Sequence, residues 1–320
     1  MSLGYLFGGG VGSEPRGVEL YRAYPGVQAL YRQVAEWTGL TVGQILDEDL
    51  PTPPESRQSV GTIRESVHAI AVHDTLAEKG LRPAVSGGLS LGGMSAAALA
   101  GAIDRRALFE MLAHARNTPD RPADSPEQGL ALAFEPIGDT TGRYRGADHP
   151  GVYLAGQFGP TTDGATRILM LSGERAALER LGADLPQDAV IQLPGRSMAI
   201  HSPLRGHFRT FMAPYIDAMP FTDPALPLIS CLDRKILVTA ADVRDAFQRN
   251  PTAPISLPYL YDAMKDEGVR LALIMGGSIP DGVLRFPFPV VHVDRPEHVE
   301  QALTTVFDLG IDISAPGVTR

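Results

Sequence analysis

Short apolar runs alternate with longer amphipathic stretches along the chain, and this alternation is typical of an α/β fold. The run GYLF predicts a first strand over residues 4–7, which the glycine-rich loop GGGVGSEPRG ends. A helix is predicted from Val18 to Trp37. Apolar residues at spacings of three and four predict a second helix over SVGTIRESVHAIAVHDTLAEKG, ending at Gly80. The proline-rich stretch DEDLPTPPES between them predicts a loop.

The pattern changes near Thr118, where the polar connector NTPDRPADSPEQ begins. After it come the apolar runs LALAFEPI, GVYLAGQFG, RILMLSG and AVIQLP, with a predicted helix in ERAALERLGAD. Several strands around at least one helix indicate a compact α+β unit. We place this unit at residues 124–197, inserted into a larger α/β unit of residues 1–123 and 198–320. The later runs LPLISCL and RLALIMGG are predicted to rejoin the main sheet.

The composition is that of an ordinary soluble protein, with 44% apolar residues among 320. A net charge of −9 argues against a broad nucleic-acid surface, which needs a basic face. The sequence contains no long uninterrupted apolar stretch and no signal-peptide pattern, so we expect a cytoplasmic protein without a membrane span. The single cysteine, Cys231, excludes an internal disulfide, and its apolar setting predicts a small buried side chain.

The glycine-rich loop after the first predicted strand is a candidate phosphate cradle. Gly8 cannot open a G-x-G-x-x-G pattern, because Ser13 occupies its sixth position. Gly10 cannot open this pattern either, because Pro15 occupies its sixth position. No G-K-[ST] follows for a P-loop. We therefore interpret the loop as a tight turn that brings backbone N–H groups close to a reacting centre.

A G-x-S-x-G pattern from Gly88 to Gly92 makes Ser90 a candidate nucleophile. The strand-like PAV before it and the helical MSAAALAGAI after it supply the strand–turn–helix context of a nucleophile elbow. The helix N-terminus would direct backbone N–H groups at an oxyanion. The alternative is a glycine-rich turn with a capping serine.

A serine nucleophile needs a base, and eight histidines compete for that role. They are His68, His73, His114, His149, His201, His207, His292 and His298. His201 stands out because SMAIHSPLRG places it at a strand-to-helix junction, where catalytic groups of α/β proteins gather. The spacing of His68 and His73 does not suit two metal ligands on one helix face, and we expect no metal site.

Several segments, in order along the chain, are similar to landmarks of one known family. YLFGGGVGSEPRGVELYRAYPGVQALY resembles that family's F-P-G-Q-G-S-Q segment with the helix after it, and GGLSLGG stands at its G-H-S-L-G-E. AALAGAID continues this match, AIHSPL resembles the family's histidine motif, and NPTAPISL and GVRLALIMGG match its late segments. Together they resemble the malonyl-CoA:acyl carrier protein transacylase family, which includes the acyltransferase domains of polyketide synthases.

The resemblance implies an α/β-hydrolase-like large subdomain with an inserted ferredoxin-like small subdomain. It also implies a ping-pong acyl transfer without a bound cofactor, in which the substrate is an acyl-phosphopantetheine thioester of CoA or an acyl carrier protein. Ser90 would be the nucleophile, His201 the base, and the Asn250 carbonyl would orient the histidine. The N–H groups of Gly10 and Leu91 would form the oxyanion hole.

Departures from the family pattern predict a more apolar acyl pocket. Leu89 replaces the histidine before the serine, and Ile200 replaces the phenylalanine before the base. The arginine that binds the substrate carboxylate in malonyl enzymes aligns with Ala115, and Arg116 follows one residue later. One residue on a helix is a rotation of about 100°, so Arg116 reaches the pocket only if the helix is adjusted.

These departures favour a relative that acts in trans in polyketide-type antibiotic biosynthesis and moves a neutral or aminoacyl group. The alternatives are a malonyl-CoA:acyl carrier protein transacylase, an editing thioesterase with the same serine and histidine, and a silent carrier-docking protein. Four arginines in GRYRG and LRGHFR are predicted to dock the acidic carrier protein: Arg143, Arg145, Arg205 and Arg209. A monomer is expected.

Overall fold

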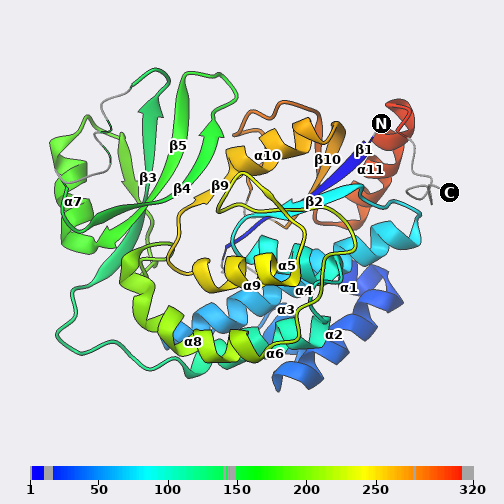
Figure 1. Ribbon diagram of the computed structural model, residues 1–320, viewed down its shortest axis with the longest axis horizontal. Coiled ribbons are helices and arrows are strands. Elements are labelled where there is room, and N and C mark those ends of the chain that lie inside the picture. The colour runs from blue at the N-terminus through cyan, green and yellow to red at the C-terminus, as the bar shows by residue number, and fades with distance from the viewer. Residues whose placement is uncertain are drawn as a thin grey trace.

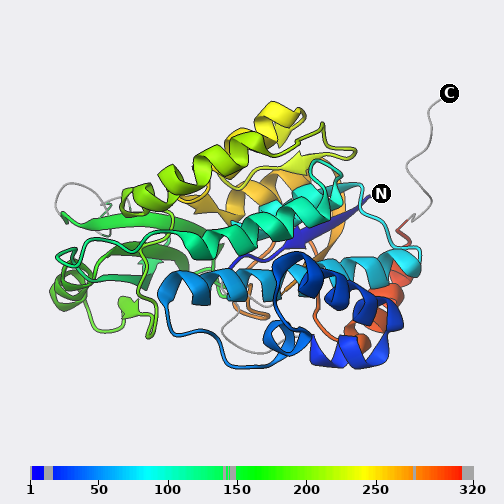
Figure 2. The ribbon, with the colours of Figure 1, turned by 90° about the horizontal axis from the view of Figure 1, so that it is seen from below.

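The structure is a computed structural model, and it describes residues 2–10, 17–139, 142, 144, 149–276 and 279–311. The described chain forms two β-sheets with helices packed around them (Figure 1). The smaller sheet and helix α7 (Arg175–Asp184) lie at one end of the molecule, and helix α11 (Pro296–Asp308) lies at the other end. A view turned by 90° shows the same arrangement (Figure 2).

The main sheet has six strands in the described residues, in the order β11-β10-β1-β2-β7-β8. All neighbouring strands are parallel except β7 and β8, which form an antiparallel pair. LPLISCL and RLALIMGG rejoin this sheet as β7 and β10, as predicted. The bounds of the strands are β1 Ser2–Phe7, β2 Val85–Gly88, β7 Leu228–Ile229, β8 Ile236–Leu237, β10 Val269–Met275 and β11 Val290–Val293.

Helices join the parallel strands and cover the sheet. Their bounds are α1 Val18–Ala23, α2 Pro25–Thr38, α3 Val42–Leu46, α4 Pro54–Glu78, α5 Leu91–Leu99, α6 Arg105–His114, α8 Gly206–Ala218, α9 Ala240–Arg249, α10 Leu257–Asp266 and α11 Pro296–Asp308.

Two helix predictions were wrong in detail, both at prolines. The single helix predicted from Val18 to Trp37 is broken at Tyr24, which is extended because Pro25 disfavours helical backbone in the residue before it. Helix α4 begins at Pro54, inside the stretch predicted as a loop. A proline fits the first position of a helix because no N–H is needed there.

The main sheet is buried on both faces, since alternate side chains of its strands enter two different apolar clusters. Tyr5 and Phe7 of β1 pack in the cluster that includes α2, α4, α5, α6 and α11. Leu6, between them, packs in the cluster formed with α10 and with part of the second sheet. Burial on both faces explains the continuous apolar runs seen in the sequence.

The second sheet has the order β6-β3-β5-β4-β9. Its strands are β3 Gln128–Pro136, β4 Val152–Pro160, β5 Thr166–Glu174, β6 Val190–Gln192 and β9 Ile255–Ser256. Within the insert, the neighbouring strands β6, β3, β5 and β4 are all antiparallel. Numbered along the chain, their order across the sheet is fourth, first, third, second, which is a ferredoxin-like order. Helix α7 packs on the outer face of this sheet. The predicted fold class is thereby confirmed.

Strand β9 comes from outside the insert and pairs parallel with β4. The short segment that carries it follows Asn250 and therefore ties the small sheet to the region of the predicted base. The boundaries at 123/124 and 197/198 stay a prediction, because the small sheet is completed by a strand of the larger unit.

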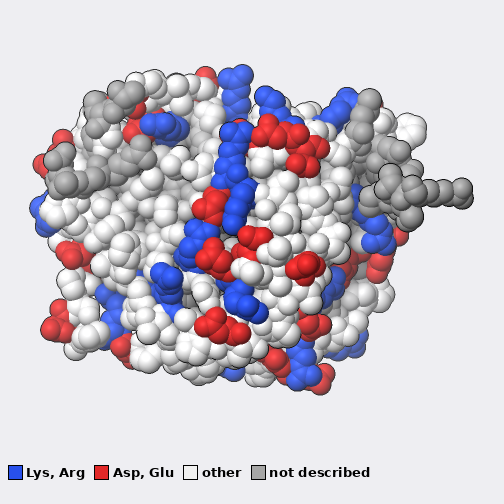
Figure 3. Space-filling view, in the orientation of Figure 1, with Lys and Arg blue, Asp and Glu red and all other residues white. Residues whose placement is uncertain are grey.

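Charged side chains form a band down the middle of the face seen in Figure 3, with positive and negative groups interleaved. Two ion pairs join the β7–β8 hairpin to neighbouring helices: Arg234 pairs with Asp266 of α10, and Lys235 pairs with Asp242 of α9. Within the described ranges, no helix has the length and apolar character of a membrane span.

Candidate active site

Ser90 occupies the turn between β2 and α5, the strand–turn–helix context that the sequence predicts. Its backbone has φ 52° and ψ −114°, a conformation that non-glycine residues rarely adopt. The turn is tightly packed: a Cβ added to Gly88 would lie 2.2 Å from the carbonyl carbon of Gly92. A Cβ on Gly92 would lie 2.3 Å from the carbonyl oxygen of Phe7. Glycine at both positions therefore permits the sharp turn that presents the serine.

The glycine-rich loop lies against this turn, as predicted. A Cβ added to Gly9 would lie 2.3 Å from the Leu89 carbonyl oxygen and 3.2 Å from the Ser90 Cβ. Gly10, with φ 105°, borders the same cavity as Ser90 and Leu91. The Leu91 N–H is the first of helix α5 and has no partner inside the helix. Both predicted oxyanion donors are therefore on residues that border the serine's cavity.

His201 also borders this cavity, and its ring is held by backbone carbonyls. Its Nδ1 lies 2.7 Å from the Asn250 oxygen and 3.2 Å from the Ala253 oxygen. A carbonyl oxygen only accepts, so Nδ1 must carry the proton and donate it, which leaves Nε2 as the acceptor. The backbone N–H of His201 donates to the Pro251 carbonyl oxygen at 3.0 Å. The sequence predicted the contact with Asn250; it gave no sign of those with Pro251 and Ala253.

The environment of His201 favours the neutral ring. The side chain is buried, and burial lowers the pKa of His201 to about 4. The two carbonyl partners raise the pKa, and the positive charge of Arg205 lowers it, but burial is the largest effect. At neutral pH the imidazole is therefore uncharged, the form that can accept a proton from a hydroxyl.

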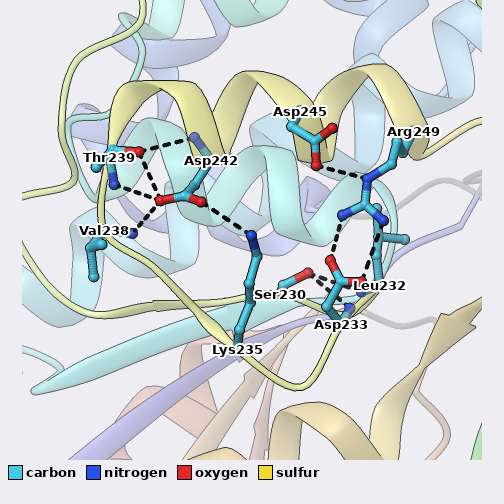
Figure 4. A network of polar contacts seen from close by, with 9 residues as sticks. All are labelled: Ser230, Leu232, Asp233, Lys235, Val238, Thr239, Asp242, Asp245 and Arg249. Atoms are coloured by element: carbon cyan, nitrogen blue, oxygen red, sulfur yellow. Dashed lines mark hydrogen bonds and ion pairs between the residues drawn. The ribbon is translucent and has the colours of Figure 1, made fainter.

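The turn that orients His201 is fixed by Arg249, the last residue of α9. The Arg249 carbonyl accepts the N–H groups of Thr252 at 3.0 Å and Ala253 at 2.9 Å. Its guanidinium donates to Asp245 at 2.8 Å and pairs with both carboxylate oxygens of Asp233 on the β7–β8 hairpin (Figure 4).

The same hairpin reaches the serine through Cys231, because the Ser90 N–H donates to the Cys231 Sγ at 3.4 Å. Cys231 is buried as predicted, and burial raises the pKa of its thiol to about 11. The hairpin thus contacts both the serine turn and, through Asp233 and Arg249, the turn that holds the histidine. No pattern in the sequence indicated this connection.

Ser90 and His201 face one cavity of about 240 Å³ that is lined mainly by apolar side chains. Leu89 and Ile200 line it, as predicted. Methionine and phenylalanine side chains from helices and the small sheet form much of the remaining wall: Met94, Met111, Phe158, Met170, Phe208, Met212 and Phe247. The sequence could not single these out, because methionine and aromatic residues at helical spacing are equally typical of a core.

Arg116, the candidate arginine for a substrate carboxylate, does not reach the cavity, as expected for a helix without an adjusted register. Ala115 lines the cavity, while Arg116 is exposed in the short 3₁₀ turn Ala115–Asn117. Its Nη2 donates to the Thr38 carbonyl at 3.1 Å, at the end of α2. The rotation of one residue takes its side chain away from the cavity.

The prediction that Arg205 docks a carrier protein was wrong, because its side chain is buried. Arg205 is 3% exposed, borders the cavity and forms a salt bridge with Glu55. Arg209, one turn later on α8, is exposed. Arg143 and Arg145 lie outside the described residues. Across the residues with described positions, no group of three or more histidine, cysteine or acidic side chains is placed to hold a metal.

Comparison with solved structures identifies the architecture. A malonyl-CoA:acyl carrier protein transacylase from Synechocystis sp. PCC 6803 superimposes with a TM-score of 0.78 at 19% identity, covering 94% of this chain and 100% of that one. One from Clostridium perfringens gives 0.83 at 16% identity, with coverages of 97% and 99%. The chain has the fold of these transacylases.

A third match is a type II polyketide synthase malonyl-transacylase in complex with its acyl carrier protein. It gives a TM-score of 0.81 at 18% identity and covers 95% of this chain and 100% of that chain. Neither a protein-family model nor a curated protein sequence matches the chain. At these identities the transacylase likeness extends to the fold, and the chemistry has to be argued from the site.

The depressed pKa of His201 gives a testable pH dependence. Because its folded pKa is below the ordinary 6.5, the folded chain binds fewer protons than the unfolded chain between about pH 4 and 6.5. His201 therefore makes the free energy of unfolding fall as the pH drops through this window.

In NMR spectra, the His201 ring signals, assigned by loss in His201→Gln, should stay at neutral-ring positions from pH 8 down to about pH 5. A midpoint near the ordinary histidine pKa would contradict the burial seen in the structure.

Proposed function

We propose that this chain is an acyltransferase that moves a neutral, largely apolar acyl group to the phosphopantetheine thiol of an acyl carrier protein. The donor is a carrier-protein or CoA thioester, and the acyl group passes through an ester on Ser90. The observation that carries the proposal is the shared cavity, which brings Ser90 and a neutral His201 to one apolar wall. The fold of the transacylases supports it.

In the first half-reaction, the Ser90 Oγ attacks the thioester carbon while His201 Nε2 takes the hydroxyl proton. The N–H groups of Gly10 and Leu91 donate to the oxyanion of the tetrahedral intermediate. As the intermediate collapses, the C–S bond breaks and the departing sulfur takes the proton from Nε2. The products are the Ser90 ester and a free thiol.

In the second half-reaction, the acceptor thiol gives its proton to Nε2 and its sulfur attacks the ester carbon. The C–O bond to Ser90 then breaks, and the serine oxygen recovers the proton from Nε2. The hydrogen bond from Nδ1 to Asn250 keeps Nε2 directed at the reacting atoms and stabilises the ring in its protonated form. No cofactor enters either step.

The lining of the cavity supports a neutral acyl group. Among the described lining residues, Arg205 is the one charged side chain, and Glu55 compensates its charge. A dicarboxylic acyl group would therefore lack a free cation for its carboxylate. An aminoacyl group would lack a carboxylate for its amine, since no described lining residue is acidic. Burying either charge unpaired is costly.

The second candidate function is malonyl transfer, which the names of the matched structures favour. The third, editing hydrolysis, uses the same serine and histidine and differs only in whether water replaces the acceptor thiol. Measurement of free acid released without an acceptor separates hydrolysis from transfer.

Acylation of Ser90 is tested by mass spectrometry of the intact protein after incubation with hexanoyl-pantetheine. Ser90→Ala should gain no acyl mass. His201→Ala should load more slowly by about 10²–10⁴-fold, as the loss of a general base predicts.

The matched control is Ser95→Ala on the same helix, because Ser95 is buried against Ser66 and does not line the cavity. It should load at the wild-type rate. Acyl mass on Ser90→Ala would overturn the assignment.

The acyl carrier protein is the proposed partner, as in the matched complex of a carrier protein with its transacylase. Of the four arginines predicted to dock it, Arg209 retains support, because it is exposed and borders the same surface hollow as Thr252, which belongs to the turn that holds His201. Arg209→Glu should raise the KM for a carrier thioester and leave the rate with acyl-pantetheine unchanged.

The difference should shrink at high salt, because exposed charges are screened. Arg22→Glu, on the exposed surface of α1, is the charge-matched control. Equal losses with both substrates would argue against docking at Arg209.

A further inference from the structure

We propose that Glu55 sets the acyl specificity of the cavity by occupying the guanidinium of Arg205, which would otherwise bind a carboxylate there. The proposal deepens the proposed function and rests on it for the identity of the cavity as an acyl site. Its binding test, below, requires no catalysis.

The contact between the two side chains has the geometry of carboxylate recognition. Arg205 Nη1 donates to Glu55 Oε1 at 2.6 Å, and Nη2 donates to Oε2 at 3.1 Å. This two-bond arrangement is the one by which arginine binds planar carboxylates. Both Nη groups are engaged, so a substrate carboxylate has to displace Glu55 to use them.

Of the two residues, Arg205 borders the cavity and Glu55 does not. Arg205 ends the short 3₁₀ helix that follows His201, whereas Glu55 lies in the first turn of α4. Their side chains are 4% and 12% exposed, so water does little to solvate either charge. Glu55 therefore acts as an internal counter-ion placed behind a cationic group that faces the acyl site.

Arg205 has contacts that do not depend on Glu55. Its Cζ lies 4.2 Å from the centre of the Phe208 ring, and Nη1 lies 3.4 Å from the Met198 Sδ. These contacts should hold the guanidinium at the cavity when the carboxylate is removed. Among the described residues paired with Glu55, the other titratable group is His207, whose Nε2 lies 3.8 Å from Oε1. Burial and the nearby Arg205 lower the pKa of His207, which favours its neutral ring.

The alternative is that the pair only ties α4 to the segment before α8. Both ideas predict that the loss of Glu55 destabilises the protein, because an unpaired buried charge remains. They differ in what restores stability. If the pair only connects the two segments, an added carboxylate does not restore the lost stability. If the Arg205 guanidinium faces the cavity, a carboxylate that enters the cavity can pair with it and restore stability.

The experiment compares the full chain, Glu55→Gln and the double variant Glu55→Gln/Arg205→Met, which lacks both charges. Thermal unfolding is measured with and without malonate, succinate or glutarate, at ionic strength matched with sodium chloride. Glu55→Gln should unfold at a lower temperature and recover at least half of the loss with one of the diacids.

The wild-type chain and the double variant should not respond to the diacids. A similar shift in all three proteins, or none in Glu55→Gln, would overturn the proposal. If Glu55→Gln does not fold in buffer alone, the readout becomes its recovery on dilution from urea, with and without the diacid.

A second measurement reads specificity directly. Glu55→Gln should raise the ratio of glutaryl or succinyl loading to hexanoyl loading on Ser90 at least tenfold, and the double variant should lose this gain. An unchanged ratio would count against the specificity role. If no thioester loads Ser90 in any of the proteins, the proposed function fails, and the binding test still decides whether Glu55 masks a carboxylate site.

Discussion

The structure of the site depends on the hydrogen bonds from His201 Nδ1 to the carbonyl oxygens of Asn250 and Ala253. A carbonyl carries no full charge, so these bonds fix the tautomer and direction of the ring without the strong pKa increase that a carboxylate partner would cause. Burial then dominates and lowers the pKa of His201 to about 4. A histidine held in this way stays neutral at physiological pH and can accept a proton.

Backbone carbonyls orient a ring only if their own turn is rigid, and the surroundings of Asn250 meet that need. Arg249 binds the turn through its carbonyl and the β7–β8 hairpin through its guanidinium. The hairpin also holds the Ser90 N–H through Cys231. Ser90 and His201 both have positive φ values, 52° and 55°, and such conformations persist where the surrounding contacts over-determine them.

Local patterns predicted the elements that position the site. The strand–turn–helix around Ser90 and the strands of the insert follow from turn residues and apolar periodicity over short windows. The strand predicted directly before His201 was wrong, because β6 ends at Gln192 and irregular backbone leads from there to the 3₁₀ helix Pro203–Arg205. The errors at Pro25 and Pro54 arose because proline both ends and begins helices, and neighbouring letters do not decide which.

What the sequence did not provide are pairings between distant residues. Glu55 and Arg205 are separated by 150 positions, so nothing near Arg205 indicated that it is buried and compensated. The same holds for Cys231 behind Ser90. The direction of Arg116 depended on one residue of helix register, which periodicity does not resolve. These pairings around the candidate site therefore appear only once the chain is folded.

The central claim is that this transacylase fold carries a serine–histidine site for a neutral acyl group. A competition experiment tests it most directly: the wild-type protein receives malonyl-CoA and hexanoyl-CoA in equal amounts, and peptide mass spectrometry identifies the acyl group on Ser90. The account predicts that the hexanoyl ester exceeds the malonyl ester at least tenfold. A malonyl ester in excess, or an acyl group on another residue, would contradict it.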